Sequence, residues 1–260
     1  MHYIQRTGGK RLTLQWRTIR IVIFVGCTLT PCWAAGAPLR FATVDFAPYA
    51  LVNGTPEKPG LIVEINAAIA ARAKVKISDT ILPIARVMKN LRHGLSDCAV
   101  FLLSPWSKER FIAVGEVIGR FDSIVVSRKG ISINHVDDLQ GRLLALPIGS
   151  YVGFQIGDDP KIRHHRTNGC AQSAKLLQAG RVDAIAGTAL SIYHYLSDLK
   201  MNRADIGDVL LFDRKPIWLH CREQSVSKAV IERFRQATNS LRTEGVFDRM
   251  FERYIPVGFR

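Results

Sequence analysis

The chain has 260 residues, of which 47% are hydrophobic and 22% charged, and its formal net charge is +14. These proportions are those of a folded protein with a sizeable core, and they exclude a disordered tail or a fibrous repeat. The basic balance favours acidic partners. No basic run is interleaved with aromatic residues, however, so the sequence predicts no nucleic-acid partner.

Residues 1–34 have the pattern of a signal peptide. They contain five basic residues, no acidic one and a short apolar run over 21–25, and small residues, Ala34 and Ala35, lie at their end. The run is much shorter than the roughly 20 residues of a membrane-spanning helix. We therefore expect cleavage near Ala34 and export of a chain that keeps a charge of +9. A lipid anchor on Cys27 is the alternative.

From residue 39 onward, β-rich runs alternate with helical stretches, which indicates parallel strands covered by helices. The first unit contains three predicted strands, two helices with one apolar face each, and an extended run. These are strands over 39–44, 76–82 and 97–103, helices over 62–73 and 84–93, and the run over 123–127.

A second unit of similar build follows. It contains predicted strands over 142–146 and 182–186 and a helix over 171–179. Extended runs over 209–212 and 217–221 come next, and two helices over 227–243 and 247–254 are expected to return to the first unit. Residues 163–166, Arg-His-His-Arg, are interpreted as a solvated loop.

No low-complexity linker separates the two units, so we expect two lobes joined by two crossings of the chain. Lobe 1 is predicted over 39–123 plus 223–260, lobe 2 over 128–216, and the hinge strands over 124–127 and 217–222. A ligand cleft is expected between the lobes, at the strand ends, where α/β sheets commonly bind small molecules.

Three cysteines remain after cleavage, Cys98, Cys170 and Cys221. One disulfide and one free thiol are possible, but spacing does not determine the pairing. Cys98 lies in an apolar run and is expected to be a buried small hydrophobe. Scattered histidines and the lack of a phosphate loop or a nucleophile motif predict neither a metal nor a cofactor.

Several short motifs occur in an order that resembles one family. They are residues 60–97, Ser-Lys-Glu-Arg at 107–110, Asp-Leu-Gln-Gly at 138–141, Gly-Arg-Val-Asp-Ala at 180–184 and Glu-Gly-Val-Phe-Asp at 244–248. The chain is similar here to the bacterial extracellular solute-binding proteins of family 3, which serve ABC transporters for amino acids. The resemblance implies a type II periplasmic binding protein fold with two βα-sandwich lobes, a periplasmic monomer, a small anionic or zwitterionic solute, a permease partner and no catalysis.

The resemblance also assigns ligand contacts. Arg110 takes the place of the arginine that binds the ligand carboxylate, because its planar guanidinium matches two carboxylate oxygens. The alternative for Arg110 is an exposed side chain paired with Glu109. Gly149 and Ser150 match a turn that completes an anion cradle from the opposite lobe, although Ser150 could simply cap a helix.

Four further residues complete the predicted site. Phe46 aligns with an aromatic residue that stacks on the ligand, Ser104 precedes the arginine motif, and Arg86 could reach the cleft or be merely exposed. Thr188 stands where amino-acid binders carry an aspartate for the ligand ammonium. Either another acid such as Asp45 replaces that aspartate, or the ligand has no α-amino group.

Two other functions remain open at this stage. Similar exported proteins include dehydratases acting on cyclohexadienyl carboxylates, for which Glu64 and Glu116 would be the candidate acids. A sensory module that kept the lobes but lost transport is the other alternative.

Overall fold

The computed structural model describes residues 37–260. The predicted signal peptide and Cys27 lie outside these residues. Within them, no helix combines the length and the apolar character needed to cross a membrane.

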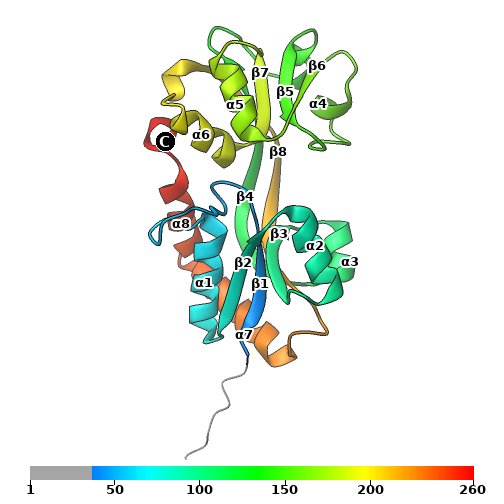
Figure 1. The fold of residues 1–260 in the computed structure, drawn as a ribbon, viewed down its shortest axis with the longest axis vertical. Coiled ribbons are helices and arrows are strands. Elements are labelled where there is room, and N and C mark those ends of the chain that lie inside the picture. The colour runs from blue at the N-terminus through cyan, green and yellow to red at the C-terminus, as the bar shows by residue number, and fades with distance from the viewer. Residues whose placement is uncertain (1–36) are drawn as a thin grey trace, which may run out of the picture. The chain divides into compact units, whose positions relative to one another are not determined.

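Eight strands form one mixed sheet (Figure 1). They are β1 Leu39–Val44, β2 Ile77–Leu82, β3 Cys98–Leu102, β4 Ile112–Arg128, β5 Leu143–Pro147, β6 Arg163–Thr167, β7 Ala184–Thr188 and β8 Ile206–Cys221. Their order across the sheet is β2-β1-β3-β8-β4-β7-β5-β6.

Helices connect most of these strands. The α-helices are α1 Leu61–Ala73, α2 Ile84–His93, α3 Pro105–Arg110, α4 Gln155–Asp158, α5 Cys170–Gln178, α6 Ala189–Asp198, α7 Lys228–Thr243 and α8 Val246–Tyr254. Short 3₁₀ turns lie at Val136–Leu139, Arg203–Asp205 and Val257–Phe259.

The two long strands β4 and β8 pair with each other and extend through both halves of the sheet (Figure 1). We call β1–β3 with α1–α3, α7 and α8 the first half, and β5–β7 with α4–α6 the second half. The first half packs α1, α7 and α8 on one sheet face, where the Phe41 and Phe234 rings meet edge to face at 5.8 Å. The second half has apolar clusters on both faces, around Ile124 and around Val125, because neighbouring strand residues point to opposite faces.

Strand direction determines which ends of the two halves face each other. β3 is antiparallel to β8, with Cys98 opposite Cys221 and Leu102 opposite Ile217, and β1 and β2 run parallel to β3. β7 is antiparallel to β4, with Thr188 opposite Ser123, and β5 and β6 run parallel to β7. Both sets of parallel strands therefore direct their carboxyl ends toward the middle of β4 and β8.

Strand pairing shows which half each predicted hinge segment contacts. Residues 124–127 pair with β7 in the second half, and residues 217–221 pair with β3 in the first. We therefore place the crossings at 119–122 and 213–216. Gly119 and Pro216 lie in these two segments, and the pairing of β4 with β8 is irregular between Ile118 and Phe121.

Residues 163–167 form strand β6 at the sheet edge, so the solvated-loop interpretation of 163–166 is wrong. Most of its side chains are exposed, which removes the alternation that identifies a half-buried strand. Charged side chains are common on edge strands because they discourage pairing with another chain.

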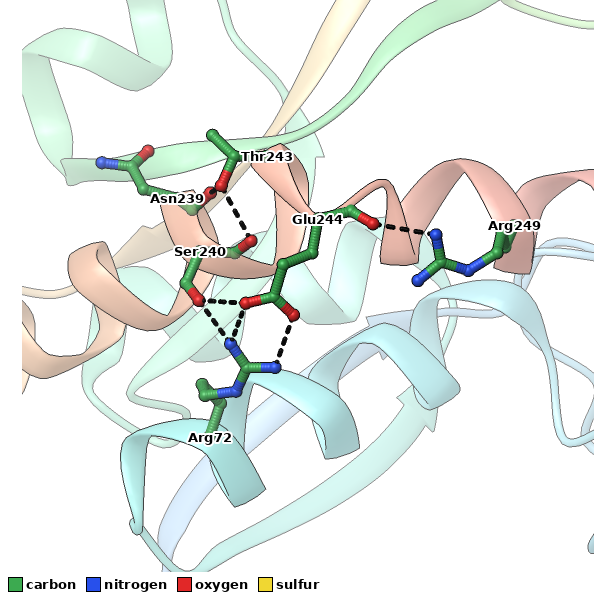
Figure 2. A network of polar contacts seen from close by, with 6 residues as sticks. All are labelled: Arg72, Asn239, Ser240, Thr243, Glu244 and Arg249. Atoms are coloured by element: carbon green, nitrogen blue, oxygen red, sulfur yellow. Dashed lines mark hydrogen bonds and ion pairs between the residues drawn. The ribbon is translucent and has the colours of Figure 1, made fainter.

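A polar network on the surface of the first half links α1 to α7 (Figure 2). Arg72, in the last turn of α1, donates to both carboxylate oxygens of Glu244 at 2.6 and 2.8 Å, and the Ser240 hydroxyl donates to the same carboxylate at 2.6 Å. The hydrogen bonds from Arg72 and then Ser240 lower the pKa of Glu244 to about 2. The network therefore stays ionised at any physiological pH.

Cys98 and Cys221 form a disulfide that joins β3 to β8, and Cys170 is a buried free thiol. Cys98 is indeed fully buried. It is bonded, however, rather than a free hydrophobe.

A buried carboxylate attaches the start of β1 to the start of β3. Asp97 accepts from the Arg40 backbone N–H at 2.8 Å and from its guanidinium at 2.7 and 3.1 Å. Burial alone would raise the pKa of Asp97, but the hydrogen bonds from Arg40 outweigh it and the pKa is lowered.

We expect Asp97→Asn to destabilise the protein at neutral pH by about 1–3 kcal/mol, the usual cost of breaking a buried charge-assisted hydrogen bond. Because the folded-state pKa lies below the unfolded one, this contribution is complete above the unfolded value of about 3.9 and is lost as the pH falls below it. Urea denaturation of both proteins from pH 7 to pH 3 measures the difference. Glu232→Gln, at an exposed pair on α7, is the control and should change little. A difference that stays constant down to pH 3 would contradict an ionised Asp97.

Candidate functional site

The predicted ligand residues follow or end the parallel strands of the two halves. Phe46 follows β1, Arg86 lies in α2 after β2, and Ser104 and Arg110 follow β3. From the second half, Gly149 and Ser150 follow β5 and Thr188 ends β7. Phe46, Arg86, Ser104, Gly149, Ser150 and Thr188 are thus at or after strand ends that face the other half. Arg110 differs, because it directly precedes β4, whose Ile112 lies opposite Cys221 at the end of the sheet where β3 begins.

Arg110 is the last residue of α3, and its side chain is 44% exposed. It donates to Glu109 at 3.0 Å and to the Trp106 carbonyl at 3.2 Å, and its guanidinium lies 5.1 Å from the centre of the Trp106 ring. These contacts match the alternative stated for Arg110, in which it is an exposed side chain paired with Glu109. All three involve residues of α3 itself, and none of them reaches the second half.

Gly149 lies in a turn with φ of +74°, a conformation that L side chains rarely adopt. The Ser150 N–H donates to the Pro147 carbonyl at 3.1 Å, whereas the Gly149 N–H and the Ser150 hydroxyl make no hydrogen bond among the described residues. Ser150 is not a helix cap, since α4 begins only at Gln155 with Phe154 before it. Two donors of this turn are therefore available to an anion.

Phe46 is half-buried and stacks on Tyr49, with ring centres 5.5 Å apart and planes 3° apart. Tyr49 also contacts Phe121 on β4 at 5.2 Å. The ring of Phe46 therefore belongs to an aromatic cluster beside the crossing. Tyr49 and Phe121 were not predicted, although both are aromatic residues next to expected strand ends.

Ser104 caps α3. Its hydroxyl accepts from the Ser107 N–H at 3.2 Å, and the Ser107 hydroxyl accepts from the Ser104 N–H at 2.9 Å. Arg86 is exposed, and its guanidinium makes no ion pair or hydrogen bond among residues 37–260.

Thr188 lies where the two halves touch. It precedes α6, whose Ser191 donates to the Ala47 carbonyl of the first half at 2.5 Å and whose Leu190 packs in the core of the first half. Thr188 is only 6% exposed, and its hydroxyl makes no hydrogen bond of good geometry, although the hydroxyl of the buried Tyr49 lies beside it. An unpaired buried hydroxyl costs free energy, so the position favours a bound group that can pair with it.

Charged pairs occupy the crossing itself. Asp122 on β4 accepts from Arg214 on β8 at 2.6 and 2.8 Å, and Lys215 pairs with Asp213 at 3.2 Å. Beside Asp122 and Arg214, on the α6 and α8 side, is a pocket of about 330 Å³ that contains none of the seven predicted ligand residues. This charge pattern was not predicted, because the crossings were expected elsewhere.

The two candidate acids of the enzyme alternative belong to the first half. Glu64, in α1, accepts from the Tyr254 hydroxyl at 2.6 Å and from Arg253. Glu116 lies on β4 opposite Trp218. Among residues 37–260, no three His, Cys, Asp or Glu side chains gather closely enough to hold a metal ion.

No family model matches this sequence, and no curated protein matches it. Many solved structures share its fold, with the Bordetella pertussis BvgS VFT2 domain among them at a TM-score of 0.66 and 16% identity, covering 83% of this chain and 92% of that one. The chain has the two-lobed Venus flytrap fold of the type II periplasmic binding proteins.

Two other Venus flytrap structures extend the comparison. An arginine-specific periplasmic binding protein of Salmonella typhimurium has a TM-score of 0.63 and 17% identity, covering 85% of this chain and 100% of the other. The GluR0 ligand-binding core of Nostoc punctiforme, in complex with L-glutamate, has a TM-score of 0.64 and 16% identity, covering 84% and 99%. At these identities the likeness concerns the fold, which agrees with the predicted α/β architecture.

Proposed function

We propose that this Venus flytrap protein captures a small carboxylate between its halves and presents the closed form to a membrane permease, without catalysis. The observation that best supports this proposal is that two sets of parallel strands end opposite each other across β4 and β8. Such strand ends are where α/β folds bind small molecules.

The carboxylate would be bound from both sides. Arg110 in the first half supplies a guanidinium that fits two oxygens. The Gly149 N–H and the Ser150 hydroxyl in the second half supply donors that have no partner in the described structure. A ligand that satisfies both sides stabilises the closed arrangement over the open one, which is how differential contacts drive hinge closure.

Arg110 must change partner for this to happen. Its contact with Glu109 at 3.0 Å joins two exposed side chains, 44% and 69% exposed. Exposed pairs of this kind are weak. Exchange of Glu109 for a ligand carboxylate in a closed, dry cleft is therefore favourable.

The location we propose is the periplasm, as a monomer. Disulfides such as Cys98–Cys221 persist in oxidising compartments and are rare in the cytosol. The predicted signal peptide over 1–34 supports the same assignment.

Incubation of the purified protein with a mixture of small carboxylates and amino acids, followed by mass spectrometry of what it retains, tests this function. We expect one carboxylate per chain, recovered chemically unchanged. At a concentration 100 times its Kd, it should add about 2.7 kcal/mol to the stability and raise Tm by roughly 5–10 °C.

Two outcomes would contradict the proposal. Conversion of a retained compound into a product would favour the dehydratase-like enzyme. Retention of a compound without an acidic group would show that the ligand is not a carboxylate. A control with Lys108→Ala, an exposed cation on the same helix as Arg110, should retain the same compound.

A further inference from the structure

Large apolar side chains are exposed at the strand ends of both halves. In the first half, Ile84 follows β2 and is 58% exposed, while Leu102 and Trp106, at and after the end of β3, are 36% and 38% exposed. In the second half, Ile148 and Val152 follow β5 and are 67% and 73% exposed. Scattered exposed apolar residues are ordinary, but a group at facing strand ends indicates a binding surface.

The turn after β5 combines exposed apolar side chains with free hydrogen-bond donors. Ile148 and Val152 lie on either side of Gly149 and Ser150, within five residues that contribute the free donors of the proposed anion cradle. Turns on a protein surface normally carry polar residues. Here the polar groups that face an anion are surrounded by aliphatic side chains, which suits a ligand with a charged end and an apolar body.

Carboxylates are scarce at the same strand ends. Asp45, directly after β1, is exposed, and its side chain makes no ion pair or hydrogen bond among the described residues. The residues that directly follow β2, β3, β5 and β6 include no acid, and β7 ends in Thr188. Thr188 can pair with a hydroxyl or carbonyl oxygen or with a neutral donor, but it cannot neutralise an ammonium.

We propose, on the basis of the proposed function, that the ligand is a carboxylic acid with an aliphatic or aromatic body and no α-amino group. Asp122 is next to Ser123, the strand partner of Thr188, but its carboxylate is already bound by Arg214. An ammonium buried against Thr188 would therefore lack a free countercharge, and desolvation of an unpaired charge is costly. A 2-oxo or 2-hydroxy acid places an oxygen where the ammonium would be, and the Thr188 hydroxyl can pair with that oxygen. The exposed aliphatic side chains then cover the apolar body when the halves close.

Calorimetric titration with matched pairs tests this proposal. Each pair shares one body: leucine with 4-methyl-2-oxopentanoate, and phenylalanine with phenylpyruvate; arginine and glutamate are added as polar amino acids. We expect each oxo acid to bind at least tenfold tighter than its amino-acid partner, and arginine and glutamate to bind more weakly still.

Single-residue variants test which side chains contact the oxo acid. Ile148→Asn and Val152→Ser should each weaken oxo-acid binding about tenfold. Leu95→Ser should leave it unchanged, because Leu95 is 56% exposed but precedes β3 and so lies at the other end of the strands. Thr188→Asp should shift the preference toward the amino acid of each pair.

The possible results separate the two proposals. Tighter binding of amino acids than of oxo acids, abolished by Asp45→Asn, would overturn the ligand class while leaving carboxylate capture intact. Unchanged affinity in both Ile148→Asn and Val152→Ser would also overturn it. A protein that binds none of these carboxylates would overturn the proposed function together with the ligand class.

Discussion

Loss of the Cys98–Cys221 disulfide should lower the free energy of unfolding by about 4–5 kcal/mol. The bond closes a loop with a sequence separation of 123 residues, and the chain-entropy estimate for a loop of about 100 residues is roughly 4.7 kcal/mol. The loop contains the whole second half, so the bond restricts the unfolded chain strongly. Urea denaturation of a variant carrying both Cys98→Ala and Cys221→Ala measures the loss.

Reductant provides the control for this result. Reduced wild-type protein should approach the double variant in stability, whereas the double variant should not respond to reductant. Cys170→Ala removes the buried free thiol and should keep the full response to reductant. Equal stability of oxidised and reduced wild-type protein, with thiols counted by mass spectrometry, would show that the bond does not constrain the unfolded chain.

Arg110→Ala should weaken carboxylate binding by about 2–5 kcal/mol, or roughly 30- to 4,000-fold in Kd. The reason is that a carboxylate left in a closed cleft without its cation bears an uncompensated desolvation cost. Arg110→Lys keeps the charge but loses the planar fork, and we expect an intermediate loss. Calorimetric titration with the tightest-binding carboxylate measures both.

Glu109, the neighbour of Arg110, allows a second test of the same site. Glu109→Gln removes the present partner of Arg110 at 3.0 Å and should therefore strengthen binding modestly. Lys108→Ala should have no effect. An unchanged Kd in Arg110→Ala would remove Arg110 from the site and leave its pair with Glu109 as its only role.

Local patterns predicted most of the fold. The strand over 39–44 and the helices that start near residues 62, 84 and 228 have clear periodicity and clear stop signals, and all of them are present. The edge strand β6 was missed because its exposed Arg and His residues do not alternate with apolar ones. The segments 119–122 and 213–216, where we place the crossings, contain Gly119 and Pro216, but the hinge prediction relied on the extended runs beside them.

The site was less predictable than the fold. A resemblance in motif order can assign Arg110 and Gly149 to strand ends, but it cannot show that Arg110 pairs with Glu109 or that the Ser150 N–H is already used. Those contacts depend on side-chain positions. The exposed apolar residues after β5 were visible in the sequence, yet only strand direction shows that Ile148 and Ile84 lie at facing ends.

The most direct test is a crystal structure with the tightest-binding carboxylate. If the two halves close on an anion, the ligand carboxylate should lie between the Arg110 guanidinium and the turn at Gly149 and Ser150, and the body of the ligand should contact Ile148. A ligand bound instead in the pocket beside Asp122 and Arg214, or Arg110 still paired with Glu109 and remote from the ligand, would contradict the account.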